Sequence, residues 1–220
     1  MLLKTKNLMK AFGGLKAINK VDFELPAGEI RGIIGPNGSG KSTFFNLVSG
    51  VYDPDPGSYI EFDGHDITNE PPHKIGALGL SRTFQLLRLY QDMSVINNVM
   101  SGYHTRVKYK FFDAVIGRKK IWDQEKEIKD EMMELLSFVG LADYAELNAS
   151  ELSGGQRRLL VLARAIAMKP KLLMLDEPAA GLSPVNVDNL MKIIMQLKDK
   201  YGLTLIICLL YTSPSPRDEL

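Results

Sequence analysis

Cysteine and net charge are the two scarcest features of this 220-residue sequence, which contains one cysteine, Cys208, and balances 27 lysines and arginines against 26 acidic residues. A single cysteine excludes an internal disulfide, so the chain is not a small disulfide-stapled fold. A formal net charge of +1 creates no field that would hold the protein on nucleic acid or on an anionic membrane. We therefore expect no nucleic-acid partner.

Long apolar runs are also missing. No run approaches the roughly 18 residues that a membrane span needs, and the first residues do not form a charged and then apolar leader. We expect a cytosolic protein that is neither secreted nor membrane-spanning. Hydrophobic residues make up 45% of the sequence, which is enough to bury the core of one large domain.

Hydrophobic patterning indicates an α/β fold. Residues 1–30 alternate apolar and polar side chains around Gly13 and Gly14, which predicts an antiparallel start. Apolar strand patterns at 29–34, 171–175 and 203–207 predict a mainly parallel core, and the first of them leads through a glycine-rich turn into a predicted helix over 41–49. Residues 94–165 predict a helical subdomain, in which we interpret the charged segment 119–134 as a solvated helix face.

The end of the chain departs from this pattern. After Ile207 the residues continue neither a strand nor a helix, and residues 208–220 resemble the in-frame translation of a sequencing adapter. We therefore expect a domain over 1–207, cut near its C-terminal end, and a non-native tail over 208–220.

A glycine-rich motif follows the first core strand. It has the phosphate-loop spacing of glycine, four residues, glycine, lysine and serine, and comprises Gly35, Pro36, Asn37, Gly38, Ser39, Gly40, Lys41, Ser42 and Thr43. Backbone N–H groups and the helix N-terminus can wrap a phosphate, Lys41 can reach its oxygens, and the Ser42 hydroxyl can bind Mg²⁺. Kinases and GTPases share this motif, so by itself it predicts only a nucleotide-phosphate site.

Two carboxylates end the strand pattern at 171–175. Asp176 is positioned to hold Mg²⁺ through its water shell, and Glu177 to orient and deprotonate the water that attacks the terminal phosphate. An acidic pair at this point can equally be a helix cap or a solvated turn.

A second helix N-terminus is predicted at Leu152-Ser153-Gly154-Gly155-Gln156, just before an apolar helical pattern at 157–167. Ser153, Gly154, Gly155 and Gln156 can present a hydroxyl and N–H groups to an anion, although a simple serine N-cap explains Ser153 alone. One domain cannot easily direct both of these helix N-termini at a single ATP. The pattern therefore favours a dimer.

The order of these three motifs resembles that of the ABC ATPase family, whose signature pentapeptide is matched at every position. The resemblance implies a P-loop NTPase fold of the ABC ATPase type that binds ATP and Mg²⁺. It also implies a head-to-tail dimer with a second ATP-binding subunit, in which Ser153 to Gln156 act on the partner's ATP. Phe12 corresponds to an aromatic residue that stacks on adenine, the alternative being a core phenylalanine, and Gln85 to a glutamine that contacts Mg²⁺ and the attacking water.

Finer features resemble the ATP-binding subunits of branched-chain amino-acid importers, namely residues 12–15, 82–85, 108–124 and 177–184. That resemblance implies transmembrane permease partners, an indirect link to a periplasmic or extracellular solute-binding protein, and a place at the cytoplasmic face of the membrane. Leu209 stands where the family has a switch histidine, and leucine cannot donate its hydrogen bond. We therefore predict a chain that binds ATP and hydrolyses it poorly.

Three alternatives remain at this stage. A soluble ABC protein of DNA repair or translation usually carries a coiled-coil insertion or a second cassette, and neither is present in the sequence. A non-hydrolytic module that closes around ATP would fit the replacement at Leu209. A small-molecule kinase would share the phosphate loop but not the signature pentapeptide.

Overall fold

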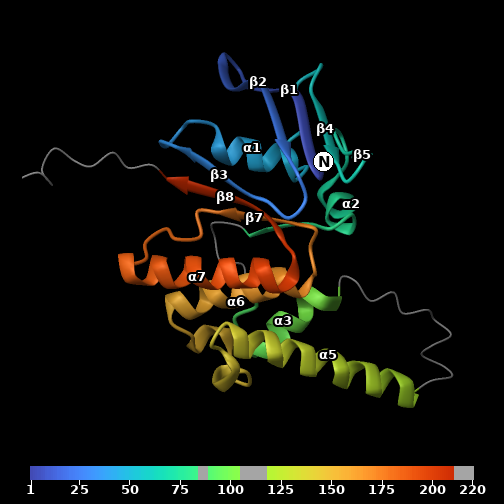
Figure 1. The fold of residues 1–220 in the computed structure, drawn as a ribbon, viewed down its shortest axis with the longest axis vertical. Helices are drawn as coiled ribbons and strands as arrows, with labels where there is room; N and C mark the ends of the chain where they lie inside the picture. The colour runs from blue at the N-terminus through green and yellow to red at the C-terminus, as the bar shows by residue number, and fades with distance from the viewer. Residues whose placement is uncertain (84–88, 105–117, 211–220) are drawn as a thin grey trace, which may run out of the picture. The chain divides into compact units, whose positions relative to one another are not determined.

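The structure of the protein, a computed structural model, describes residues 1–83, 89–104 and 118–210. The chain divides into two compact units. The first comprises residues 1–85, 171–181 and 196–220 and contains both sheets, whereas the second comprises residues 86–170 and 182–195 and is helical (Figure 1).

An antiparallel sheet opens the first unit, with strand order β2-β1-β4-β5. Its first hairpin joins β1 (Leu3–Phe12) to β2 (Leu15–Leu25), and the smaller part consists of β4 (Tyr59–Phe62) and β5 (His65–Asp66). The hairpin turns at Gly13, whose φ of 59° suits glycine because it has no Cβ. The predicted antiparallel start is therefore confirmed.

The second sheet of the first unit is parallel, with strand order β3-β8-β7-β6. Its strands are β3 (Ile30–Gly35), β6 (Leu80–Thr83), β7 (Leu172–Asp176) and β8 (Thr204–Leu210). All five residues of β7 are buried, which explains its uninterrupted apolar pattern.

Strand β8 continues past the end that the sequence predicted. The prediction that strand structure stops at Ile207 is wrong, because Cys208 pairs with Ile33 and Leu210 pairs with Gly35. Pairing through backbone groups depends little on side-chain identity, so a tail of unusual composition can still extend the ladder. The remaining tail, residues 211–220, lies outside the described residues.

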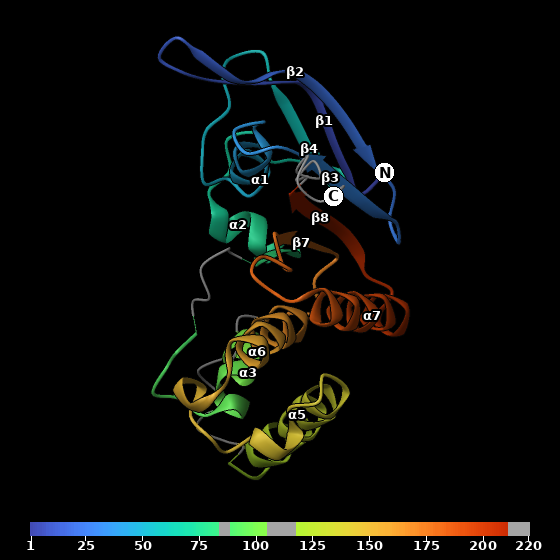
Figure 2. The same cartoon turned by 90° about the vertical axis from the view of Figure 1, so that its left-hand side faces the viewer.

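Helix α1 (Lys41–Val48) lies between the two sheets, and α2 (Pro72–Ala77) follows β5 (Figures 1 and 2). Phe44 and Phe45 of α1 are buried, and the Phe44 ring meets Phe23 of β2 edge to face at 5.2 Å. The helix that follows the glycine-rich motif is thus anchored in the main hydrophobic core.

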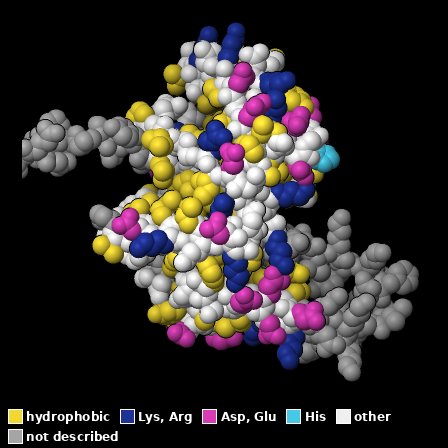
Figure 3. Space-filling model, in the orientation of Figure 1, with side chains coloured by type: hydrophobic (Ala, Val, Ile, Leu, Met, Phe, Trp, Pro, Cys, Tyr) yellow, Lys and Arg dark blue, Asp and Glu magenta, His cyan; other side chains and the backbone are white. Residues whose placement is uncertain are grey.

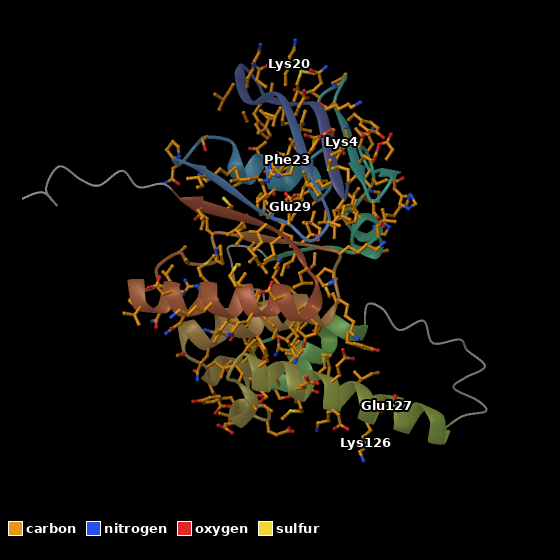
Figure 4. The ribbon with its side chains drawn as sticks, in the orientation of Figure 1. Lys4, Lys20, Phe23, Glu29, Lys126 and Glu127 are labelled. Carbon is orange, nitrogen blue, oxygen red and sulfur yellow. The ribbon has the colours of Figure 1, made fainter. Side chains whose placement is uncertain are left out.

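The helical unit contains α3 (Val95–His104), α5 (Arg118–Phe138) and α6 (Gly154–Ala167), two short 3₁₀ helices η1 (Ala142–Tyr144) and η2 (Ala149–Glu151), and most of α7 (Pro184–Tyr201). Helix α3 packs on both α5 and α6. On α5, Ile128 and Met132 are buried while Lys126 and Glu127 are exposed, and Lys126 points away from the other helices of this unit (Figure 4). The described part of the charged segment is therefore a solvated helix face, as predicted.

Charges of both signs are interspersed over the face shown in Figure 3. Within the described ranges 1–83, 89–104 and 118–210, no helix has the length and apolar character to cross a membrane.

Candidate functional site

The glycine-rich motif forms a tight loop between β3 and α1. Gly38 and Gly40 have φ values of 79° and 92°, which a residue with a side chain rarely adopts. Gly40 also lies against β2, since a Cβ added there would stand 2.4 Å from the carbonyl oxygen of Ala17. Gly38 is therefore favoured by the backbone conformation, and Gly40 by both the backbone conformation and the close packing against β2.

The loop presents the N-terminus of α1. Gly40 is the N-cap and has no side chain, so it provides no side-chain acceptor for the first N–H groups of the helix. Lys41 is 7% exposed, and its Nζ donates to the carbonyl oxygens of Gly35 at 2.7 Å and Pro36 at 2.8 Å. Ser42 is exposed on the first turn. This cradle of N–H groups with one ammonium group fits a phosphate group.

Asp176 and Glu177 come at the carboxyl end of β7. Asp176 is 6% exposed, and its Oδ2 accepts a hydrogen bond from Arg82 at 2.7 Å. Glu177 has a φ of 49°, and its N–H donates to the carbonyl oxygen of Cys208 at 3.2 Å. Burial, together with the neighbouring Asp176 carboxylate, raises the pKa of the Cys208 thiol to about 11. The thiol beside this carboxylate is therefore neutral at physiological pH.

The parallel register brings the loop and the two carboxylates to one sheet edge. Strand β8 lies between β3 and β7, and Cys208 pairs with Ile33 on one side and with Asp176 on the other. Asp176 is thus level with Ile33, two residues before Gly35, at a lateral separation of two strand spacings, about 10 Å. Ligands of open parallel sheets bind at this edge.

Arg82 is a site residue whose contacts the sequence did not predict. Its guanidinium group is buried in β6 and bonds Asp176, Asn46 and Ser49. A signal was present, since Arg82 is a single charged residue between Ser81 and Thr83 in a short buried strand, but its partners are 33 to 94 residues away in sequence.

Phe12 lies at the turn end of the β1–β2 hairpin and is 45% exposed, so it is not the core phenylalanine of the alternative prediction. Its ring meets that of Tyr52 edge to face at 5.5 Å. Because Gly40 packs on Ala17, and Leu15 pairs with Phe12, this hairpin end is next to the phosphate loop. Such a position suits a base attached to a phosphate chain.

In the helical unit, Ser153 is the N-cap of α6. Its Oγ accepts from the Gln156 N–H at 3.4 Å, and its own N–H donates to Gln156 Oε1 at 2.9 Å, which together form a capping box. Ser153, Gly154 and Gly155 are exposed, and a Cβ added to either glycine would meet nothing within 4 Å. The N-cap interpretation is therefore correct, and the same helix end is open to an external group. Gln85 lies outside the described residues.

Comparison with known proteins shows which family has these motifs. The ABC transporter family matches residues 18–180, which include the phosphate loop, the signature pentapeptide and both carboxylates. The chain belongs to the ABC transporter family. As a member of it, the chain is an ATP-binding ATPase with an ABC-type α/β fold.

Two curated relatives match almost the whole chain. One is the probable branched-chain amino acid transport ATP-binding protein LivG of Archaeoglobus fulgidus, 43% identical over 210 residues that cover 94% of this chain and 78% of the relative. The other is the high-affinity branched-chain amino acid transport ATP-binding protein LivG of Escherichia coli K12, 37% identical over 206 residues that cover 94% and 80%.

Two solved structures have the same fold. One is an ATP-binding cassette of an ABC transporter in its ADP conformation, with a TM-score of 0.80 and 32% sequence identity. The match covers 96% of this chain and 82% of the cassette's chain. A nucleotide-free ATP-binding cassette from an ABC transporter has a TM-score of 0.77 at 33% identity and covers 94% and 80%. The predicted fold class is therefore confirmed.

Proposed function

We propose that this ABC ATPase powers an importer of branched-chain or similar amino acids. The proposal is supported by the relatives of that named function, which match along 94% of the chain. The single structural observation that carries it is the meeting of the phosphate loop with Asp176 and Glu177 at one edge of the parallel sheet.

In this proposal the described residues divide the work on ATP. The loop from Gly35 to Thr43 holds the phosphates through its N–H groups and Lys41, which exchanges its bonds to loop carbonyls for bonds to phosphate oxygens. Phe12 stacks on adenine. Glu177 orients the attacking water and accepts its proton as ATP and water become ADP and phosphate.

Mg²⁺ fits the oxygen donors of this site, namely the Ser42 hydroxyl and, through water, the Asp176 carboxylate, with Gln85 as a further proposed contact. When bound, the ion would neutralise charge on the phosphate oxygens. Asp176 is buried and fixed by Arg82, so its carboxylate is already oriented without the ion.

The exposed start of α6 suits a contact made in a dimer. We expect Ser153, Gly154, Gly155 and Gln156 of one subunit to close on the ATP held by a second ATP-binding subunit, because Ser153 and both glycines are exposed and a Cβ added to either glycine would meet nothing within 4 Å. Dimer closure would drive transmembrane permease subunits at the cytoplasmic face of the membrane, which receive substrate from a solute-binding protein.

The test is phosphate release by the purified chain and its Glu177→Gln variant. We expect the substitution to lower the rate at least ~100-fold, the usual contribution of a general base, and to leave ATP binding intact. Glu127→Gln, the same chemical change at an exposed position of α5, is the matched control. An unchanged rate in Glu177→Gln would remove Glu177 from the reaction.

The dimer and the partners need separate measurements. In Glu177→Gln, ATP should produce a dimer by analytical ultracentrifugation, and an added Ser153→Arg substitution should abolish it without preventing ATP binding. Co-expression with permease genes of the same genome should yield a membrane complex that takes up radiolabelled leucine. Purification free of membrane subunits, with no uptake, would favour a soluble ABC protein of another function.

A further inference from the structure

Arg82 bridges two parts of the proposed ATP site. Its Nη2 donates to Asp176 Oδ2 at 2.7 Å, and its Nη1 donates to Asn46 Oδ1 at 2.6 Å and to Ser49 Oγ at 3.2 Å. The side chains of Arg82 and Asp176 are only 7% and 6% exposed. The two terminal nitrogens of the guanidinium group therefore donate hydrogen bonds to two different elements, Nη2 to β7 and Nη1 to α1.

The contacts of the guanidinium group leave it little freedom. Its Cζ lies 5.4 Å from the centroid of the Phe45 ring, within cation–π range. Ser49 donates its own hydroxyl proton to the Phe45 carbonyl at 2.7 Å, which leaves the Ser49 oxygen as an acceptor for Arg82. Phe45 is fully buried, so the guanidinium group rests on a fixed part of the core.

The spacing along α1 connects the guanidinium group to the phosphate loop. Asn46 comes four residues after Ser42, and Ser49, the C-cap of α1, comes seven residues after Ser42, so all three lie on one side of the helix. That side is the one tied to Asp176 through Arg82. The proposed Mg²⁺ donors, Ser42 and Asp176, therefore belong to two elements that share a core and are bridged by one buried side chain.

We infer that Arg82 is a positioning residue for Mg²⁺-bound ATP, fixing the Asp176 carboxylate relative to Ser42 on α1. The inference rests on the proposed function. A planar guanidinium can bond two acceptors at a fixed angle, whereas an ammonium group is a point charge on a flexible stem. Lysine at position 82 would keep the positive charge and lose the simultaneous bonds to Asp176 and Asn46.

The test separates metal-dependent binding from binding alone. ATP affinity is to be measured by calorimetry once in EDTA and once in Mg²⁺. The ratio of the affinity in Mg²⁺ to that in EDTA is the gain from Mg²⁺. For Arg82→Lys and Asn46→Ala we expect EDTA affinities within about 2-fold of the unsubstituted chain but a gain that is lower by roughly 10- to 100-fold, the usual effect of losing a partner of a metal ligand. Arg31→Lys, an exposed arginine in β3, is the matched control and should keep the full gain.

The outcomes distinguish this inference from the proposed function. A full Mg²⁺ gain in both Arg82→Lys and Asn46→Ala, with only a lower urea midpoint, would make Arg82 a structural residue and overturn the inference. If the unsubstituted chain itself shows no gain from Mg²⁺, the metal site of the proposed function fails first. Arg82→Met, which leaves the Asp176 charge buried and unpaired, is checked by circular dichroism, and if it does not fold the two milder variants still decide.

Discussion

Gly40→Ala tests the packing of the phosphate loop most directly. At φ 92° an alanine is strained, which costs ~1–3 kcal/mol, partly offset by about 0.4–1 kcal/mol from the stiffer unfolded chain. Its Cβ would also stand 2.4 Å from the Ala17 carbonyl oxygen, a backbone atom of β2 that cannot rotate away. Forcing α1 and β2 apart adds ~1–3 kcal/mol, the usual cost of overpacking.

Gly57→Ala is the matched control. Gly57 has a φ of 91°, so the backbone strain is the same, but the nearest atom to an added Cβ is Met9 Cε at 3.5 Å, an ordinary contact. The difference between the two variants therefore reports mainly the steric contacts with the Ala17 carbonyl and, at 3.0 Å, with Ile18 Cδ1. We expect Gly40→Ala to lower the free energy of unfolding by ~1–3 kcal/mol more than Gly57→Ala does.

Urea unfolding followed by far-ultraviolet circular dichroism measures both free energies. Titration with ATP adds a functional measurement, because a shift of the first turn of α1 moves the N–H groups of the loop. Equal destabilisation in the two variants would refute the reasoning, since it would mean that the loop does not press on β2.

Three further predictions concern the base, the switch position and pH. Phe12→Ala should weaken ATP binding roughly 5- to 150-fold, as expected for one base-stacking contact, without affecting inorganic triphosphate, which has no base; calorimetry measures both. Leu209→His should raise the rate of phosphate release, because imidazole can donate a hydrogen bond that leucine cannot. The free energy of unfolding should fall as pH rises from about 9 to about 11. The folded Cys208 thiol has a pKa of about 11 against an ordinary 9.0, so in this pH range only the unfolded chain loses the thiol proton. Urea unfolding at each pH measures the change.

Each of these predictions has its own control. Leu15→Ala, an exposed apolar change beside Phe12, should leave both affinities unchanged, and equal losses of ATP and triphosphate in Phe12→Ala would argue against stacking. A rate in Leu209→His no higher than that of the starting chain would assign the switch role elsewhere. Cys208→Ala should reduce the loss of stability between pH 9 and 11, most clearly below pH 10, because Tyr59 and Lys4, whose pKa values are also raised, contribute only above it; an unchanged slope below pH 10 would assign the loss to other groups.

Local sequence determined the parts of the protein that depend on neighbouring residues. The phosphate loop from Gly35 to Thr43 was predictable because its glycines serve a backbone conformation that few residues adopt, as the positive φ values of Gly38 and Gly40 show. Strand β7 was predictable because a strand buried on both faces must be apolar throughout. The N-cap at Ser153 followed from its place before a helical pattern.

Tertiary structure alone decided how these parts meet. The strand order β3-β8-β7-β6 inserts the last strand between the loop and the carboxylates, and no local pattern encodes that order. The exposure of Phe12 and the continuation of β8 to Leu210 likewise depend on strands that are distant in sequence. Arg82 shows the same limit, because its partners Asn46 and Asp176 are 36 and 94 residues away and become neighbours only when α1 packs on the parallel sheet. Hydrogen bonds between side chains are set by such long-range packing, which residue periodicity does not record.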